Sequence, residues 1–163
     1  MSTVNSSPVL KHPAACSEDE LRTFQALVRA NGLASAARVP ESELLAFLYN
    51  NAGRLIAAGA IKNPSPGYQQ RVFNTYAGLT TASESWPSHE VGFFSIAQHY
   101  QGQGLGRRIL QALINEMPHA PLFATTRTPG MARLLEEQEF TVVGNHWTTA
   151  PEQEPLALYI RKV

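Results

Sequence analysis

The chain has 163 residues, 44% hydrophobic and 16% charged, which suffices for one sizeable core but not for two ordinary domains. Thirteen basic and thirteen acidic residues give a formal charge of zero, so nothing draws the whole chain toward nucleic acid or an anionic membrane. The single cysteine, Cys16, excludes an intramolecular disulfide and argues against a cysteine-based metal site. We expect one domain over residues 1–163, with residues 1–7 flexible, and neither a nucleic acid nor a membrane as partner.

The N-terminal stretch lacks the basic start and long apolar centre of a signal peptide, and no run approaches the roughly 18 apolar residues of a membrane span. A cytoplasmic protein is the default expectation. The five histidines show no i, i+4 pair of the kind that binds zinc on a helix, so no metal is expected. Whether the chain forms a homodimer stays open at this level.

In the first part of the chain, the expected elements are an edge strand, a helix and a hairpin. Residues 9–12 suit the edge strand. Ser17 and Glu20 form the pattern of a capping box, and apolar residues at helical spacing follow them. Two apolar runs, 44–49 and 54–61, flank the turn sequence Asn-Asn-Ala-Gly, which predicts an antiparallel hairpin.

The remainder predicts alternating helices and strands. Ser65 and Pro66 suit the cap and first turn of a helix whose apolar residues begin at Tyr68 and end at Tyr76. The later elements are, in order, a strand at 91–97, a helix from Leu105 to Met117, a strand at 121–126, a helix opened by Thr128 and Pro129, and strands at 140–143 and 156–160.

The most informative segment is residues 90–114, EVGFFSIAQHYQGQGLGRRILQALI, where a strand-like run passes through closely spaced glycines into an amphipathic helix. Glycines allow a tight turn with exposed amides, and the first turn of a helix leaves N–H groups unpaired and partly positive. Such a junction can bind a phosphate. Arg107 and Arg108, in the first turn of that helix, would either be compensated by a bound polyanion or remain solvated.

Two familiar phosphate-binding patterns do not fit these glycines. The P-loop sequence G-x-x-x-x-G-K-[ST] is absent, which removes support for a nucleoside triphosphatase. The dinucleotide pattern G-x-G-x-x-G fails because Gly102 and Gly104 are followed by Arg107 in the place of the third glycine. The next strand, at 121–126, also lacks the acidic residue that would hold a ribose.

The segment resembles the acyl-CoA-binding motif of the GNAT acetyltransferase superfamily, which reads Arg or Gln, two residues, Gly, one residue, then Gly or Ala. Here the motif runs from Gln101 to Gly106, with Tyr100 before it. Since the succession of strands and helices also agrees, the resemblance covers nearly the whole chain and is strongest from Glu90 to Phe140. It implies an α/β fold of the α+β type, with a mixed, mostly antiparallel central sheet and helices on both faces.

The resemblance also implies an activity: transfer of an acetyl group from acetyl-CoA to a primary amine of a small molecule or peptide, by direct attack in a ternary complex. The pantetheine arm would lie along the backbone of the cofactor strand, and the pyrophosphate on the amides of the glycine loop. Mapped onto this sequence, the cofactor-binding residues are Phe94, Ser95 and Ile96 in the strand, and Gln101, Gly102, Gln103, Gly104, Leu105, Gly106 and Arg107 in the loop and helix.

Attack by an amine requires a base, because an ammonium with a pKa of about 10.4 is mostly protonated at neutral pH. Glu90 is the candidate. It lies eleven residues before Gln101, where the histone acetyltransferases of the family carry their catalytic glutamate. The alternative is an ordinary charged residue at the entrance of a strand.

Glu139 stands where a glycine usually precedes the phenylalanine that is Phe140 here, and at two further places the sequence departs from the family pattern in ways that bear on the chemistry. Thr128 stands where many members have an asparagine that contacts the cofactor, and Leu135 where they have a tyrosine that protonates the leaving thiolate. Leucine cannot donate a proton. Either the thiolate leaves without a donor or another group serves, and the candidates are Ser95, His99, Tyr100 and His146.

The acceptor is not identified by the sequence. Trp86 and Trp147 either line an acceptor pocket or belong to the core. The two departures also keep a second class open, a non-catalytic module that binds and senses acyl-CoA. A third class is a nucleotide-binding protein of another fold.

Overall fold

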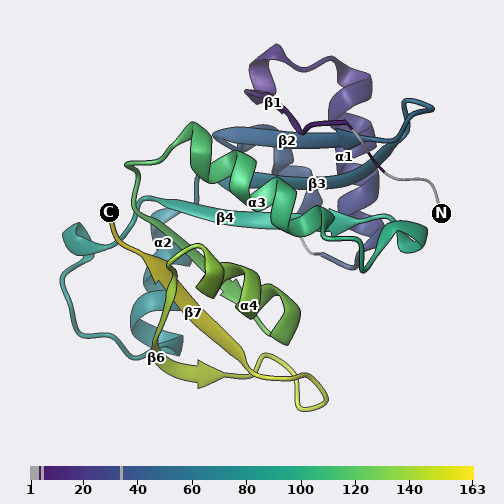
Figure 1. Ribbon diagram of the computed structural model, residues 1–163. Coiled ribbons are helices and arrows are strands. Elements are labelled where there is room, and N and C mark those ends of the chain that lie inside the picture. Colours follow the sequence, from purple (N-terminus) through teal and green to yellow (C-terminus); the bar gives the residue numbers. More distant parts are fainter. Residues whose placement is uncertain (1–3, 5, 34) are drawn as a thin grey trace. The chain divides into compact units, whose positions relative to one another are not determined.

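The computed structural model describes residues 4, 6–33 and 35–163 (Figure 1). The expected flexibility of residues 1–7 falls partly on residues 1–3 and 5, which lie outside the described residues. The elements are β1 (Val9–Lys11), η1 (Pro13–Ala15), α1 (Glu18–Ala30), η2 (Ala36–Glu41), β2 (Leu44–Tyr49), β3 (Leu55–Lys62), α2 (Pro66–Gln70), the π-helical turn η3 (Arg71–Tyr76), η4 (Ser83–Ser85), β4 (His89–Ile96), η5 (Gln98–Tyr100), α3 (Leu105–Glu116), β5 (Leu122–Thr126), α4 (Pro129–Glu137), β6 (Thr141–Trp147) and β7 (Leu156–Arg161).

Seven strands form a mixed sheet in the order β1-β2-β3-β4-β5-β7-β6. The β1–β2, β2–β3, β5–β7 and β6–β7 ladders are antiparallel, and β4 pairs with β5 in parallel. The expected fold class is confirmed. The chain divides into two compact units, residues 1–62 with 91–117 and residues 63–90 with 118–163, and β4 contributes to both. That the chain acts as one domain stays a prediction.

In the first unit, α1 and α3 cover opposite faces of the strands (Figure 1). α1 begins at the capping box that its sequence predicts. Phe24 of α1 meets Phe47 of β2 edge-on, with ring centroids 5.2 Å apart. Neighbouring strand residues point to opposite faces, so Ala46 and its partner Gly59 lie on the side of α3, where Gly59 faces Ile109.

In the second unit, α2 and η3 cover the face of β5 and β7 that carries Phe123 and Leu158. Phe73 of η3 meets Phe123 edge-on at 5.0 Å between ring centroids. α4 lies on the other side of β7 (Figure 1). α2 starts where the sequence predicts, because the side chain of Ser65 accepts a hydrogen bond from the amide of Tyr68 at 3.2 Å.

Most predicted elements are confirmed to within one or two residues, and two differences have physical reasons. β6 runs on to Trp147 because Gly144, with φ of 72°, bends the strand and lets pairing resume between Trp147 and Leu156. The short 3-10 helix η2 contains Pro40 and gives no helical period to recognise. Among the described residues, no helix combines the length and apolar character needed to cross a membrane.

Candidate functional site

The glycine-rich segment forms a loop between η5 and α3 whose shape depends on two left-handed residues. Gly102 has φ of 80°, and Gly104, the N-cap of α3, has φ of 76°. A Cβ on Gly102 would have no atom within 4 Å, and one on Gly104 would meet only Arg107 Nη1 at 3.9 Å. The space beside both glycines is therefore open, and the amides of Leu105, Gly106 and Arg107 at the start of α3 precede the first intrahelical hydrogen bond, which Arg108 makes to the carbonyl of Gly104. These features fit an anionic group such as the pyrophosphate of CoA.

The entry to this loop is fixed by hydrogen bonds within the first unit. The hydroxyl of Tyr100 accepts from Asn50 Nδ2 at 3.1 Å, and Asn50 Oδ1 accepts from the amides of Ala52 and Arg54. The amide of Tyr100 donates to the carbonyl of Ala97 at 2.8 Å. The turn of the β2–β3 hairpin thus supports the residue that precedes the motif.

The two arginines of the first turn differ in their partners. Arg108 donates to the carbonyl of Val4 at 3.0 Å and to the carbonyl of Ser6. Its charge is therefore directed at the N-terminal segment, which the sequence alone did not indicate. Arg107 is exposed and lies beside Gly104, so it is the arginine placed next to the open loop.

The cofactor strand β4 contains a strained residue. Phe93 has φ of 57°, a left-handed conformation that is unfavourable for a bulky side chain. The hydroxyl of Ser95, which is 1% exposed, donates to the carbonyl of Phe93 at 3.1 Å. Phe94 lies over Gly59, whose added Cβ would come within 3.2 Å of the Phe94 ring. β4 is thus irregular along the stretch predicted to carry the pantetheine arm.

Glu90 lies at the start of β4 and is 3% exposed, and it pairs with Phe123 of β5. The register places the side chains of Glu90, Phe123 and Thr125 on one face of the strands, the face that α2 covers. Tyr68 of α2 donates its hydroxyl to Glu90 Oε2 at 2.9 Å. The predicted catalytic carboxylate therefore belongs to a buried polar group in the second unit.

The hydroxyl of Tyr68 is held in its protonated form. Burial, the charge of Glu90 and the hydrogen bond to that carboxylate raise the pKa of Tyr68 well above its usual range. A hydrogen bond with Thr125 and the charge of Arg71 act in the opposite direction with smaller effect. Tyr68 is therefore a donor, and not a proton source, at ordinary pH.

A family model of the GNAT acetyltransferases matches residues 13–140. The chain belongs to the GNAT acetyltransferase family. Its fold is similar to that of Escherichia coli ElaA, with a TM-score of 0.66 and 11% identity over 96% of this chain and 99% of that chain. An acyl-CoA N-acyltransferase from Pseudomonas aeruginosa has a similar fold, with a TM-score of 0.64 and 16% identity over 95% of this chain and 98% of that chain. A chain of the NatC complex bound to Gag peptide and CoA is also similar, with a TM-score of 0.64 and 16% identity over 97% of this chain and 99% of that chain. No curated protein sequence matches the chain.

The two departures from the GNAT pattern occupy structural positions. Thr128 is the N-cap of α4, and its hydroxyl accepts from the amide of Met131 at 3.4 Å. Leu135 is fully buried. Of the groups considered as alternative proton donors, His99 and His146 are exposed. The hydroxyls of Ser95 and Tyr100 take part in the hydrogen bonds described above. None of these positions identifies the donor.

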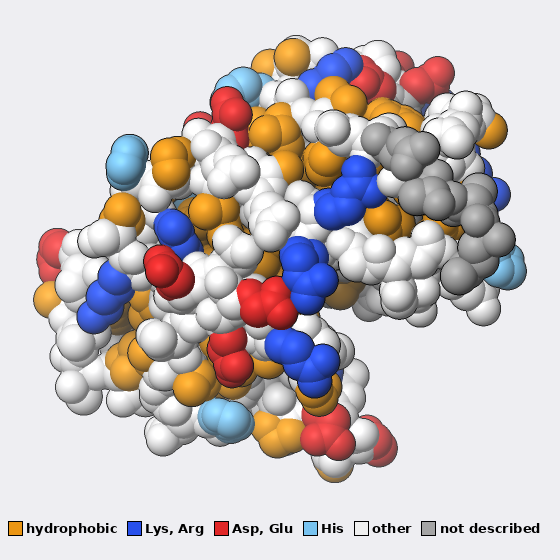
Figure 2. All heavy atoms as spheres, viewed as in Figure 1, with side chains coloured by type: hydrophobic (Ala, Val, Ile, Leu, Met, Phe, Trp, Pro, Cys, Tyr) orange, Lys and Arg blue, Asp and Glu red, His pale blue; other side chains and the backbone are white. Residues whose placement is uncertain are grey.

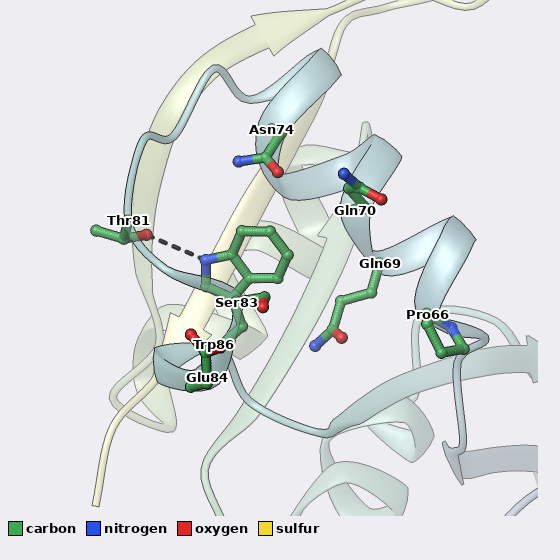
Figure 3. Close-up of a pocket in the computed structure, with 8 residues that line it drawn as sticks. All are labelled: Pro66, Gln69, Gln70, Asn74, Thr81, Ser83, Glu84 and Trp86. Carbon is green, nitrogen blue, oxygen red and sulfur yellow. Dashed lines mark hydrogen bonds between the residues drawn. The ribbon is translucent and has the colours of Figure 1, made fainter.

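A cavity of about 430 Å³ opens in the second unit of this GNAT protein, beside α2 and η3 (Figure 3). Carboxamides from Gln69 and Asn74 line one side, and Trp86 lies across the other. The indole N–H of Trp86 donates to Thr81 Oγ1 at 3.0 Å, and the indole stacks on Phe73 at 4.7 Å between ring centroids. Trp86 therefore both lines a cavity and belongs to the aromatic core. That the cavity takes the acceptor stays a prediction.

Trp147 has a different neighbourhood. It stacks on Tyr76 with ring centroids 5.6 Å apart and is not among the residues that line the cavity.

Basic and acidic side chains are interspersed over the face shown in Figure 2, in keeping with the formal charge of zero. In the described part of the chain, no three or more His, Cys, Asp or Glu side chains are grouped so that they could hold a metal ion.

Sequence reasoning missed Tyr68, which it assigned only to the apolar face of a helix. A signal was present, because a tyrosine three residues after the cap Ser65 is fixed in the first turn of α2, and its phenol carries a polar end into the core. What the sequence does not contain is the β4–β5 register that places Glu90 and Thr125 opposite that helix.

Proposed function

We propose that this GNAT protein moves an acetyl group from acetyl-CoA to a primary amine of a small molecule or peptide, by direct attack in a ternary complex. The observation that carries the proposal is the glycine loop before α3, with Gly102 and Gly104 left-handed and open space beside both. The match of the family model supports the same reaction class. The similar NatC chain comes from a complex bound to a peptide and CoA, and we carry that pairing of ligands over as part of the proposal.

The backbone of β4 and the loop would bind the donor substrate. Phe94, Ser95 and Ile96 would meet the pantetheine arm through their backbone, where the amide of Ile96 now donates to Asn31 Oδ1 at 3.3 Å. Residues from Gln101 to Arg107 would offer amides and one guanidinium to the pyrophosphate. Acetyl-CoA supplies the acetyl group as a thioester. Amides aimed at the thioester oxygen would stabilise negative charge that develops there.

Glu90 is the proposed base. The acceptor binds mainly as an ammonium and must lose a proton before its nitrogen can attack. A carboxylate that is 3% exposed is shielded from bulk water and can accept that proton directly or through one water molecule. We further propose that the protein works in the cytoplasm and requires no nucleic acid, membrane or metal.

The second candidate is a module that binds acyl-CoA without turnover. Leu135 favours it, because this fully buried leucine occupies the place of the tyrosine that protonates the leaving thiolate in many members. Thr128 favours it too, since its hydroxyl is used to cap α4. The two candidates share a cofactor site and differ in turnover.

Calorimetric titration with acetyl-CoA, and with CoA, ATP and NAD as comparisons, tests the shared site. Gly104→Asp should weaken acetyl-CoA binding by about tenfold or more, because it adds a negative charge and a side chain at a left-handed position. Gly130→Asp, in the first turn of α4 with nothing within 4 Å of its Cβ, is the matched control and should bind normally. Absence of binding by either CoA species would contradict both candidates.

Turnover separates the two candidates. With acetyl-CoA and a panel of spermidine, lysine amide and a peptide with a free N-terminus, Glu90→Gln should lower kcat by roughly 10²- to 10⁴-fold while acetyl-CoA still binds. Tight binding with no turnover on any of these amines, or on a wider panel, would favour the sensing module. If Glu90→Gln leaves turnover unchanged, Glu90 is not the base, and the proposal of acetyl transfer to an amine still holds.

A further inference from the structure

Three polar side chains from three separate elements meet in the second unit: Tyr68 of α2, Glu90 of β4 and Thr125 of β5. The Tyr68 hydroxyl is 2.9 Å from Glu90 Oε2 and also hydrogen-bonds with Thr125. The helix cap at Ser65 fixes Tyr68 in the first turn of α2, and the parallel register with Phe123 fixes Glu90. The contact is therefore determined by the fold and does not depend on a flexible surface side chain.

In this contact the hydroxyl of Tyr68 is the donor and the carboxylate of Glu90 the acceptor. An ionised carboxylate can only accept, and a tyrosine with a raised pKa keeps its proton, so Tyr68 is the donor to Glu90 whenever that carboxyl is ionised. A donor to the charged form stabilises that form relative to the neutral acid. Since Glu90 is 3% exposed, this donor takes the place of hydrogen bonds that water would make to an exposed carboxylate.

We propose that Tyr68 is a positioning residue for Glu90: its hydroxyl holds Oε2 and fixes the orientation of the carboxylate. The inference rests on the proposed role of Glu90 as the base. In the proton transfer, the acceptor's N–H bond breaks and an O–H bond forms on the carboxylate of Glu90. Tyr68 keeps its own proton, and Glu90 later returns the transferred proton to solvent.

Other charged or titratable groups stand near the pair in the described structure. Arg71 follows Tyr68 by three residues and acts on its hydroxyl electrostatically. His89 precedes Glu90 on β4, and its Nδ1 is buried without a hydrogen-bond partner among the described residues. Both stay in place when only the hydroxyl of Tyr68 or of Thr125 is removed, so their influence is common to all the proteins compared.

Infrared titration of the protein alone tests the proposal without any turnover. The carboxylic acid band that is present in the parent protein and missing from Glu90→Gln reports protonation of Glu90. In Tyr68→Phe the midpoint of this band should move to higher pH by about one to two units, the equivalent of losing one hydrogen bond to a charged group. Tyr76→Phe removes a hydroxyl from the exposed end of η3 and should leave the midpoint unchanged.

A midpoint in Tyr68→Phe equal to that of the parent would overturn the proposal. If Tyr68→Phe does not fold by circular dichroism, Thr125→Val decides, because it keeps the tyrosine and removes the hydroxyl that supports it. A smaller shift in the same direction is expected there, and no shift would count against the proposal.

The pH profile of turnover separates failure of this inference from failure of the proposed function. With whichever amine of the panel is acetylated, Tyr68→Phe should move the acidic limb of kcat/KM upward by the same amount and recover most of its rate at high pH. A merely structural role would lower the rate at every pH and leave the limb in place. An infrared shift in a protein that acetylates no amine would support the pairing of Tyr68 with Glu90 and contradict the proposed acetyltransferase activity.

Discussion

At the scale of single residues, Gly59 is the position where the packing of the first unit tolerates least change. A Cβ added there would lie 2.5 Å from Ile109 Cγ2 on α3 and 3.2 Å from the Phe94 ring. Both neighbours are held by the structure around them, Ile109 in the buried face of α3 and Phe94 within β4. Gly59 is therefore explained by the close approach of α3 to β3, and not by backbone conformation.

Gly59→Ala should destabilise the protein by about 1–3 kcal/mol, the usual cost of inserting a methyl group into a filled core. Denaturant unfolding followed by circular dichroism measures the change. Gly130→Ala is the matched control, because its Cβ would meet nothing within 4 Å and alanine favours a helix. Equal stability of the Gly59→Ala protein and the parent would show that α3 can move away from β3 at little cost.

Residue by residue, the sequence was informative where a function depends on local pattern. Gly102 and Gly104 could be placed in a turn because their spacing before an amphipathic helix requires one, and their left-handed conformations bear this out. Glu90 could be named only through its distance from that motif. Its partner Tyr68 could not, because the contact depends on pairing between β4 and β5 across a gap in the chain that no local pattern encodes.

The left-handed Phe93 was also beyond prediction. A phenylalanine between glycine and phenylalanine in an apolar run indicates a regular strand. The observed φ of 57° accompanies a ring that is buried and has the Lys62 ammonium 4.5 Å from its centroid. Tertiary packing has here overridden the local preference.

At the scale of elements, the start of α1 shows a local signal and a long-range contact acting on one residue. The side chain of Ser17 accepts from the amide of Glu20 at 3.1 Å, and Glu20 accepts in return from the amide of Ser17 at 2.9 Å. Glu20 also accepts from Lys11 of β1 at 2.7 Å. The capping box was predictable from sequence, whereas the link from helix to edge strand was not.

Ser17→Ala and Glu20→Gln should respond differently to pH. Ser17→Ala removes a cap and should cost about 1 kcal/mol at any pH. The hydrogen bond from Lys11 lowers the pKa of Glu20 below its ordinary value of 4.5 and raises that of Lys11. A lowered carboxyl pKa gives stability that is present above the unfolded value and lost as pH falls through the folded value.

Glu20→Gln keeps a residue that can complete the capping box and removes only the charge. Its midpoint of thermal unfolding should therefore be lower than that of the parent at neutral pH, and the difference should vanish in strong acid. The Ser17→Ala deficit should persist there. A Glu20→Gln deficit that is the same at both pH values would mean that the charge contributes nothing and that the shape of the side chain matters instead.

At the scale of the whole molecule, the chain passes from one compact unit to the other at 62–63, 90–91 and 117–118, the second time within β4. His89 and Glu90 of β4 belong to the second unit and the rest of β4 to the first, and each unit is assembled from two separate stretches of chain. A strand that loses its pairing in one unit loses support in the other, so we expect the units to unfold together, as the prediction of a single domain requires.

The two tryptophans allow this to be measured, because Trp86 and Trp147 both lie in the second unit whereas Gly59 lies in the first. Gly59→Ala should shift the unfolding transition seen by tryptophan fluorescence as far as the one seen by circular dichroism, which reports both units. A fluorescence transition that stays at the parent's denaturant midpoint, with a circular dichroism curve that splits into two steps, would show independent units. In that case β4 would act as a linker between two separately stable parts, and stability in each would have to be treated on its own.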